Sequence, residues 1–486
     1  MDKKNFTFCG KLLFVLLIFN TLNVFAQWQA DYRLTNSPYP SYASSNNMWC
    51  VAASGNFVHV VWYDNRNGSY EIYYKRSTDG GTNWEADVRL TNDPAASLAP
   101  AIAVSGQVIH VVWSDNRPGN YEIYYKRSTD AGVTWGTDIR LRNNSADATN
   151  PSVCVSGSVV NAVWEDNRDG NLEIYQKRST DGGISWGSDV RLTNNFASSF
   201  LPHISVTGLI VHVVWADVRD GNGEIYYKRS TDAGISWSAD TRLTNHTGDK
   251  DYPSVSSTGS DVHVVWSDQR DGNREIYYKG STDNGVTWGA DTRLTNDPAV
   301  SSTPSVASSG SVVHVVWNEN RDANFEIYYK RSTNRGLSWQ ADSRLTNDPD
   351  ISEHPSVTTS GTYVHVVWDD GRDGNLEIYY KRDPTGNPIG IINIGSEIPD
   401  GFSLSQNYPN PFNPSTKIQF TIPHSSFVRM VVYDLLGREI ETLVKQNLNA
   451  GAYSVDWGAS KYSSGVYFYR IQTERFTDTK KMLLIK

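Results

Sequence analysis

Two charged residues recur seven times in this chain, always two positions apart. The first is aspartate, replaced once by glutamate, and the second is always arginine; a glutamate such as Glu71 follows each pair. Together these pairs could bind the polar groups of a ligand. Alternatively, each arginine pairs with its neighbouring carboxylates and holds a tight hairpin, with Asp-Gly at its turn. The pairs are Asp64 and Arg66, Asp115 and Arg117, Asp166 and Arg168, Asp217 and Arg219, Asp268 and Arg270, Glu319 and Arg321, and Asp370 and Arg372.

The elements that carry these pairs form an internal repeat. Trp62 begins a series of tryptophans that continues to Trp368 in steps of 51 residues, and such an array must be recognised before any local assignment. Each repeat holds four candidate strands, as in residues 304–308, 312–317, 326–331 and 342–345. No stretch shows helical periodicity. We therefore expect an all-β chain whose residues 27–382 form a seven-bladed β-propeller.

The turn between the third and fourth strands carries the most specific signal. Residues 77–84 fit the pattern Ser-x-Asp-x-Gly-x-x-Trp. The carboxylate can accept hydrogen bonds from the N–H groups of its own turn, the glycine tolerates positive φ, and the tryptophan buries a large area. The turn closely resembles the Asp-box, or BNR, repeat of sialidase-type propellers, where the resemblance implies a folding element on the face away from the active site. Its acidic or amide position is Asp79, Asp130, Asp181, Asp232, Asp283 and Asn334.

The two ends of the array complement each other. Residues 28–36 match residues 288–296, so this leading segment has the tail of a turn and a fourth strand. The seventh repeat stops after residues 377–382 and lacks both. Because a closed ring removes exposed strand edges, we expect Tyr32–Leu34 to pair with the strand around Ile378–Lys381. The alternative is six full blades with a decorated remnant.

The loop between the second and third strands shares one face with the entry to each first strand, and this is the usual ligand face of a propeller. The charged pairs would lie there, but their spacing makes a poor Ca²⁺ loop, since arginine stands where an oxygen ligand is needed. Around a ring, a column of histidines would lie too far apart to share a metal, so we expect packing residues and no metal or cofactor. The column is His59, His110, His212, His263, His314 and His365, with Asn161 in the third repeat.

Residues 1–26 have the features of an export signal: early lysines, an apolar run from Leu12 to Phe19, and Ala26 at a cleavage site. A membrane anchor is the alternative, although the run is short for spanning; after signal removal no transmembrane segment is expected. The formal net charge of -9 gives no basic surface for nucleic acid. Cys50 and Cys154 lie in different repeats and imply no disulfide framework.

A separate module follows the array. Residues 383–402 are expected to be a linker, and residues 403–486 to form a small immunoglobulin-like β-sandwich. Residues 403–414, 432–439, 464–470 and 480–486 resemble the sorting domain read by the type IX secretion system. The resemblance implies that the secretion machinery is a partner and that the protein crosses the outer membrane to be surface-held or released. The alternative is a generic immunoglobulin-like appendage.

The function that follows is a choice among three. A sialidase needs an arginine triad, a tyrosine nucleophile with a carboxylate partner, and an aspartate acid. Its tyrosine nucleophile makes it an exception among glycosidases. These groups converge asymmetrically, whereas the repeats here are near-identical, so no catalytic residue is carried over. We expect a secreted or surface-held propeller that binds a glycan or another extracellular ligand. A sialidase-like glycoside hydrolase and a structural or adhesion scaffold are the alternatives.

Overall fold

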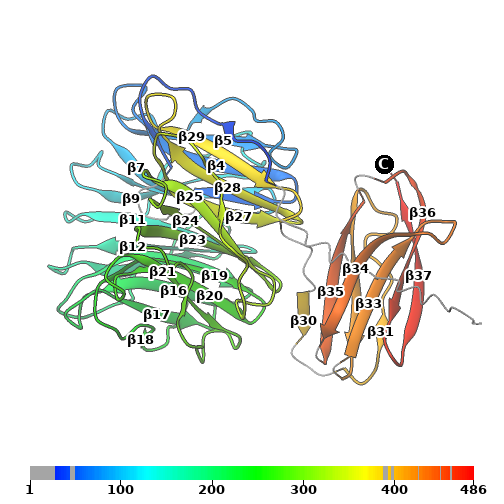
Figure 1. The fold of residues 1–486 in the computed structure, drawn as a ribbon. Helices are drawn as coiled ribbons and strands as arrows, with labels where there is room; N and C mark the ends of the chain where they lie inside the picture. Colours follow the sequence, from blue (N-terminus) through cyan, green and yellow to red (C-terminus); the bar gives the residue numbers. More distant parts are fainter. Residues whose placement is uncertain are drawn as a thin grey trace, which may run out of the picture.

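The computed structural model describes residues 28–43, 50–386, 392–395, 399–424, 426–448, 450–459 and 462–485. All regular elements in these ranges are β-strands (Figure 1). Within the same ranges there is no helix long and apolar enough to cross a membrane. The expected export signal lies outside the described residues and stays a prediction.

Seven antiparallel sheets occupy residues 32–383 of the described chain. The first comprises β2 (Ser41–Tyr42), β3 (Val51–Ser54), β4 (Phe57–Asp64), β5 (Glu71–Ser77) and β6 (Val88–Arg89). The second is β7 (Ser97–Ser105), β8 (Val108–Asp115), β9 (Glu122–Ser128) and β10 (Ile139–Arg140). The third is β11 (Ala148–Ser156), β12 (Val159–Asp166), β13 (Glu173–Ser179) and β14 (Val190–Arg191). The fourth is β15 (Ser199–Thr207), β16 (Ile210–Asp217), β17 (Glu224–Ser230) and β18 (Thr241–Arg242).

The remaining three sheets follow the same order. The fifth is β19 (Lys250–Thr258), β20 (Asp261–Asp268), β21 (Glu275–Ser281) and β22 (Thr292–Arg293). The sixth is β23 (Ser301–Ser309), β24 (Val312–Glu319), β25 (Glu326–Ser332) and β26 (Ser343–Arg344). The seventh is β27 (Ser352–Ser360), β28 (Tyr363–Asp370) and β29 (Glu377–Asp383), completed by β1 (Tyr32–Arg33).

Each second strand is a β-branched run buried on both faces, which suits the centre of a stacked sheet. In β8, Val111 and Trp113 have no exposed surface, and each of the seven repeat tryptophans is buried in the same way. Neighbouring first strands contact each other from sheet to sheet, and β27 contacts β3, so the circle closes. This all-β arrangement of repeated sheets fits the predicted β-propeller.

The leading segment of the described chain completes the seventh sheet. Tyr32 pairs with Tyr380 and Arg33 with Tyr379, and the N–H of Leu34 donates to the carbonyl of Ile378 at 2.8 Å. The predicted pairing is therefore confirmed. β1 covers an edge of β29 that would otherwise be open to another chain.

The turns between third and fourth strands tie each sheet to the one before it. In the second sheet, the Ser128 hydroxyl donates to Asp130 at 2.7 Å, and Asp130 accepts from the N–H of Thr134 at 2.9 Å. The turn tryptophan Trp135 lies edge-on to Tyr74 of the first sheet, with ring centroids 4.9 Å apart. The same contact recurs in most of the sheets, so the turn organises an inter-sheet seam.

Two further sheets lie after residue 391. One is β30 (Ile392–Gly395), β31 (Ser403–Leu404), β32 (Ser415–Ile422) and β35 (Gly451–Gly458). The other is β33 (Ser426–Tyr433), β34 (Glu439–Leu448), β36 (Gly465–Gln472) and β37 (Thr477–Leu484). Both sheets contribute to one apolar core that includes Ile418, Val432, Trp457 and Ile471. Two layers around one core are what the alternating pattern predicts.

Candidate functional site

The second sheet shows how the predicted charged pairs are used. The Asp115 carboxylate is fully buried and accepts from Trp113 Nε1 at 2.9 Å and from the Ser97 hydroxyl at 2.8 Å. Arg117 Nη2 lies 2.6 Å from the same carboxylate, and Arg117 Nη1 lies 2.9 Å from Asp138. Hydrogen bonds from Arg117 and Trp113 outweigh burial and lower the pKa of Asp115. The pair is internally satisfied.

The other six sheets repeat this arrangement, and Glu319 substitutes for aspartate without breaking it. In every sheet the carboxylate has no exposed surface, and the arginine bridges it to a second aspartate beside the fourth strand. Each guanidinium also lies over a third-strand tyrosine. This geometry favours the hairpin-holding interpretation of all fourteen residues, because breaking a buried pair is costly.

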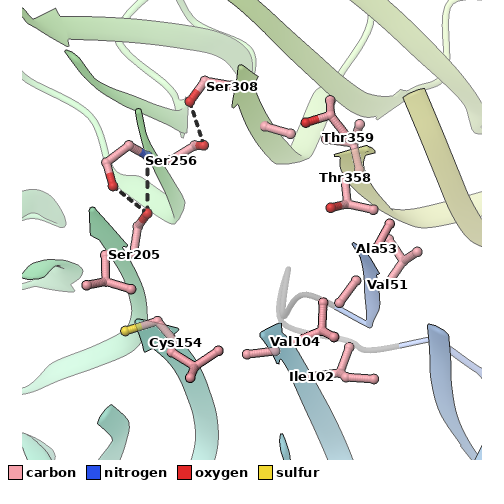
Figure 2. A pocket seen from close by; sticks show the side chains of 17 residues that line it. Val51, Ala53, Ile102, Val104, Cys154, Ser205, Ser256, Ser308, Thr358 and Thr359 are labelled. Carbon is pink, nitrogen blue, oxygen red and sulfur yellow. Dashed lines mark hydrogen bonds between the residues drawn. The ribbon is translucent and has the colours of Figure 1, made fainter. Parts of the chain in front are cut away.

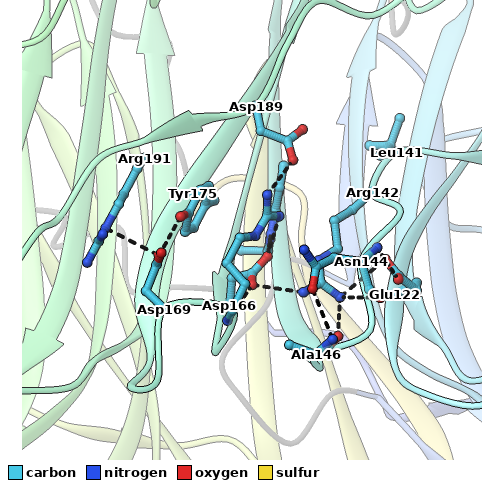
Figure 3. Close-up of polar contacts among 12 residues, drawn as sticks. Glu122, Leu141, Arg142, Asn144, Ala146, Asp166, Asp169, Tyr175, Asp189 and Arg191 are labelled. Carbon is cyan, nitrogen blue, oxygen red and sulfur yellow. Dashed lines mark hydrogen bonds and ion pairs between the residues drawn. The ribbon is translucent and has the colours of Figure 1, made fainter.

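The glutamate that follows each charged pair is buried as well, and its partner differs between the first and second sheets. Thr91 donates to Glu71 in the first sheet. In the second sheet Arg142 stands in place of that threonine and is fully buried. Figure 3 shows its polar contacts. Arg142 reaches Glu122 at 3.3 Å and Asp166 of the third sheet at 2.9 Å. Alanine holds the position of the usual serine beside Asp166, so Arg142 supplies a hydrogen bond in place of the one that the serine hydroxyl donates in the second sheet.

The histidine column is a packing column. His110 Nδ1 lies 2.8 Å from the Tyr125 hydroxyl within the second sheet, and the equivalent contacts occur in five other sheets. In the third sheet Asn161 accepts from Gln176 at 2.7 Å, so both members of the pair change together. Burial lowers the pKa of His110 to about 4 and that of His59 to about 3. These imidazoles are neutral at physiological pH.

A channel runs between the seven first strands (Figure 2). It encloses a cavity of about 230 Å³. Its lining is apolar on the side of the first three sheets, as at Ile102 and Val104, and carries hydroxyls on the opposite side. Two of these, Ser256 and Ser308, lie 2.8 Å apart and link the fifth sheet to the sixth. The channel holds no charged side chain among its lining residues.

Next to the loop between the second and third strands, one pair of positions differs from sheet to sheet. In each sheet, the second residue of the first strand pairs with the residue just before the buried acid of the second strand; we call these the rim pairs. They are Tyr42 and Tyr63, Leu98 and Ser114, Thr149 and Glu165, Phe200 and Ala216, Asp251 and Ser267, Ser302 and Asn318, and Glu353 and Asp369.

The rim pairs were not predicted from the sequence. Their signal was present, because near-identical repeats make a variable column visible without any other sequence. The invariant charges are the more conspicuous pattern, and the structure shows them to be internally paired. The divergent column lies where the start of each first strand pairs with the end of the second strand.

Several rim carboxyls are held in environments that perturb them. Glu165 is buried, which raises its pKa, and it accepts from Thr149 at 2.9 Å, Asn150 at 2.6 Å and the N–H of Leu201 at 2.9 Å. Burial raises the pKa of Asp251 to about 6, although Arg274 lies 2.6 Å away and acts in the opposite direction. In the described ranges no group of three His, Cys, Asp or Glu side chains could hold a metal ion.

Comparison with solved structures supports the fold class. The described fold is similar to a polysaccharide lyase, Uly1, with a TM-score of 0.50 and 10% identity over 73% of this chain and 99% of that one. It is also similar to phage phi92 endosialidase, with a TM-score of 0.48 and 10% identity over 79% of this chain and 72% of that one. At 10% identity the likeness to the lyase shows the fold alone.

Sequence comparison adds two findings. Residues 406–486 match the family of the secretion system C-terminal sorting domain. The protein is therefore directed through type IX secretion to the outer cell surface. A curated relative, xyloglucanase Xgh74A from Acetivibrio thermocellus, is 26% identical over 251 residues, which is 44% of this chain. The match spans only 28% of the xyloglucanase.

Proposed function

We propose that this protein is a seven-bladed β-propeller of the Asp-box type, exported to the cell surface, which binds an extracellular glycan on its loop face without cleaving it. In this proposal residues 27–382 form the propeller, residues 383–402 the linker, and residues 403–486 the sorting domain. The relative named a xyloglucanase supports a polysaccharide as the ligand class, and the sorting domain supports an extracellular encounter.

The rim pairs are the observation that carries the proposal. Saccharide and other small-ligand sites combine aromatic or apolar surface with a few polar groups at fixed positions. The rim supplies both, because Tyr42, Tyr63 and Phe200 are half-buried aromatics, and Glu353 is a half-buried carboxylate. Most of the buried positions beneath are repeated from sheet to sheet, whereas the rim pairs differ in every sheet.

The fourteen loop residues enter this proposal mainly as supports of that face. Only the edges of the seven guanidiniums remain partly exposed, since their carboxylate partners are buried. If these edges contacted ligand, seven equivalent weak sites would act together through avidity on a repetitive target. The number of ligands bound per chain separates this arrangement from a single rim site.

A glycan array with the purified full-length protein tests the proposal. We expect retention on plant or bacterial polysaccharides, with xyloglucan the first to examine, and no release of reducing ends during incubation. The same preparation is assayed with fluorogenic sialosides and β-glucosides. Absence of binding to every glycan would contradict the proposal, and so would turnover that a single rim substitution abolishes.

A hydrolase is the second candidate, and one observation favours it. The Asp251 carboxyl has a pKa of about 6, so it can hold a proton near neutral pH as a general acid must. Asp251 also lies at the rim, beside Tyr252 on the same strand. The expected outcome for a hydrolase is loss of turnover in Asp251→Asn with binding preserved. A binding protein shows no turnover in either form.

A further inference from the structure

The seventh and first sheets meet on the loop face at a group of side chains that is not repeated in the other described sheets. Two adjoining rim pairs contribute to it, together with one residue from the second hairpin loop and one from the β27 bulge. The N–H of Ala43 donates to the Asp369 carboxylate at 3.1 Å and joins the two sheets at this point. The junction cluster comprises Tyr42, Tyr63, Tyr70, Glu353, His354 and Asp369.

Three aromatic rings form one side of the junction cluster. Tyr42 and Tyr63 are stacked, with centroids 5.2 Å apart and ring planes 20° apart. Tyr70 lies edge-on to both, at 6.3 Å from Tyr42 and 5.7 Å from Tyr63. All three are only half-buried. The other six described sheets fold without three aromatics at these positions, so the blade itself does not require them.

The seventh sheet contributes charged groups to the cluster. Asp369 is 1% exposed, and its second oxygen lies 2.9 Å from His354 Nδ1. Burial lowers the pKa of His354, but the charges of Asp369 and Glu353 outweigh it and the net shift is upward. Glu353 is half-buried and forms no hydrogen bond or ion pair with any residue in the described ranges. Its carboxylate is therefore an acceptor with capacity for a ligand.

The net charge of the cluster limits the ligand. Two carboxylates stand against one imidazole, and the arginine of the seventh sheet, Arg372, is engaged by Asp370 and Asp31. An acidic sugar would meet like charge with no guanidinium free to neutralise it, which is unfavourable at short range. A sugar without acidic groups would instead donate its hydroxyls to the carboxylate and lay an apolar face on the aromatic rings.

We infer that the junction cluster is the saccharide subsite of this protein and that it takes a pyranose unit without carboxylate groups. The inference rests on the proposed function and deepens it, because it replaces a general loop-face site with one asymmetric site per chain. Tyr42, Tyr63 and Tyr70 supply the stacking surface, and Glu353 accepts hydrogen bonds from ring hydroxyls. Asp369 positions His354 and joins the two sheets.

Variants taken from the other repeats test the subsite, because each installs a residue that another blade already tolerates. Tyr70→Leu copies Leu172 of the third sheet, Tyr63→Ser copies Ser114 of the second, and Glu353→Ser copies Ser302 of the sixth. The matched control is Tyr121→Leu, which makes the Tyr70→Leu change in the second sheet. Each full-length protein is measured on an array of neutral oligosaccharides with sialylated and uronate-bearing counterparts.

We expect wild type to bind at least one neutral oligosaccharide and to disfavour its acidic counterparts. Tyr70→Leu, Tyr63→Ser and Glu353→Ser weaken that binding at least tenfold, while Tyr121→Leu does not change it and all four melt cooperatively. If one tyrosine variant fails to fold, Glu353→Ser still tests the subsite, since the Glu353 side chain forms no hydrogen bond or ion pair in the described ranges. Undiminished binding by the variants, or preference for acidic glycans, overturns the subsite and leaves the proposed function standing. Absence of any glycan binding overturns both.

Discussion

At the scale of single residues, the repeated charges of this protein are paired within their own sheets. Each carboxylate at the end of a second strand is removed from water and accepts from a tryptophan N–H and an arginine. The same carboxylate, tryptophan and arginine contacts thus recur in every one of the seven sheets. Where the usual partner is missing, a compensating residue takes its place, as Arg142 does for the buried Asp166.

The first prediction concerns that buried pair. Asp115→Asn leaves Arg117 without its closest anionic partner, so we expect unfolding free energy to fall by about 3–5 kcal/mol, as for other broken buried pairs. Chemical denaturation of the ligand-free protein measures it. The control, Asp130→Asn, alters an exposed turn that already works with Asn334 in the sixth sheet, and should cost much less. Equal stability of the two variants would contradict a structural role for Asp115.

The second prediction concerns pH. His110 has a pKa of about 4 in the folded protein, against about 6.5 in an unfolded chain. Between these values the unfolded chain takes up a proton that the folded protein does not, so stability falls as pH is lowered. The double variant His110→Asn, Tyr125→Gln installs the pair found in the third sheet and removes one such proton.

We therefore expect the pH dependence of the unfolding free energy between pH 6 and 4.5 to become shallower by up to about 1.4 kcal/mol per pH unit, the value for one proton. Denaturant titrations at several pH values measure this slope. The same pair is present at Asn161 and Gln176, so the variant should fold. An unchanged slope would show that His110 is protonated or solvated in the folded state.

At the scale of elements, the ring depends on one short strand supplied by the leading segment. Trp28 lies edge-on to Tyr329 with centroids 4.9 Å apart, and Trp339 lies in the same way against Tyr278 at 5.0 Å. The leading segment therefore provides the seventh sheet with the tryptophan contact that the sixth sheet obtains from its own turn. Closure is a property of this segment rather than of the seven repeats alone.

The third prediction follows from this equivalence. Trp28→Ala should lower the unfolding free energy by about 3 kcal/mol, the order found for large aromatic truncations, and Trp339→Ala should do the same. Deleting residues 28–36 should lower the melting temperature far more, because it opens an edge as well. Thermal melts of the three proteins check both points. A harmless Trp28→Ala beside a harmful Trp339→Ala would mean that the leading segment is not docked.

Much of this element-scale architecture could be predicted from the sequence, and the reason is physical. A spacing repeated without insertions leaves one solution for the strands, and the partial repeat at residues 28–36 fits the gap left after residue 382. The division of the first strand of the first sheet into β2 and β3 could not be predicted in detail. Five extra residues follow Ala43 in the sequence, relative to the other repeats.

The candidate site was harder to predict, because the same regular repeat hides the positions that differ. Equality among repeats draws attention to invariant residues, while burial of Asp64 or Asp115 depends on tryptophan and arginine partners that only the folded sheet brings together. The junction cluster lies where residues more than three hundred positions apart meet, as in the contact between Ala43 and Asp369. Such proximity follows from ring closure and cannot be read from local spacing.

At the scale of the whole molecule, near-identical sheets carry rim pairs that differ from one sheet to the next. The turn face and the buried network repeat from sheet to sheet, and the sorting domain directs the protein to the cell surface. The rim pairs differ in every sheet, and the junction cluster lies where the first and seventh sheets meet. The ring of near-identical sheets thereby presents one junction cluster that the other described sheets do not repeat.

Binding stoichiometry tests this central claim most directly. Isothermal titration calorimetry of the full-length protein with the neutral oligosaccharide that binds best on the array gives the number of sites per chain. One site per chain, lost in Tyr70→Leu and kept in Tyr121→Leu, is the predicted result. Seven equivalent sites would place binding on the repeated arginine loops instead, and that result would contradict the account.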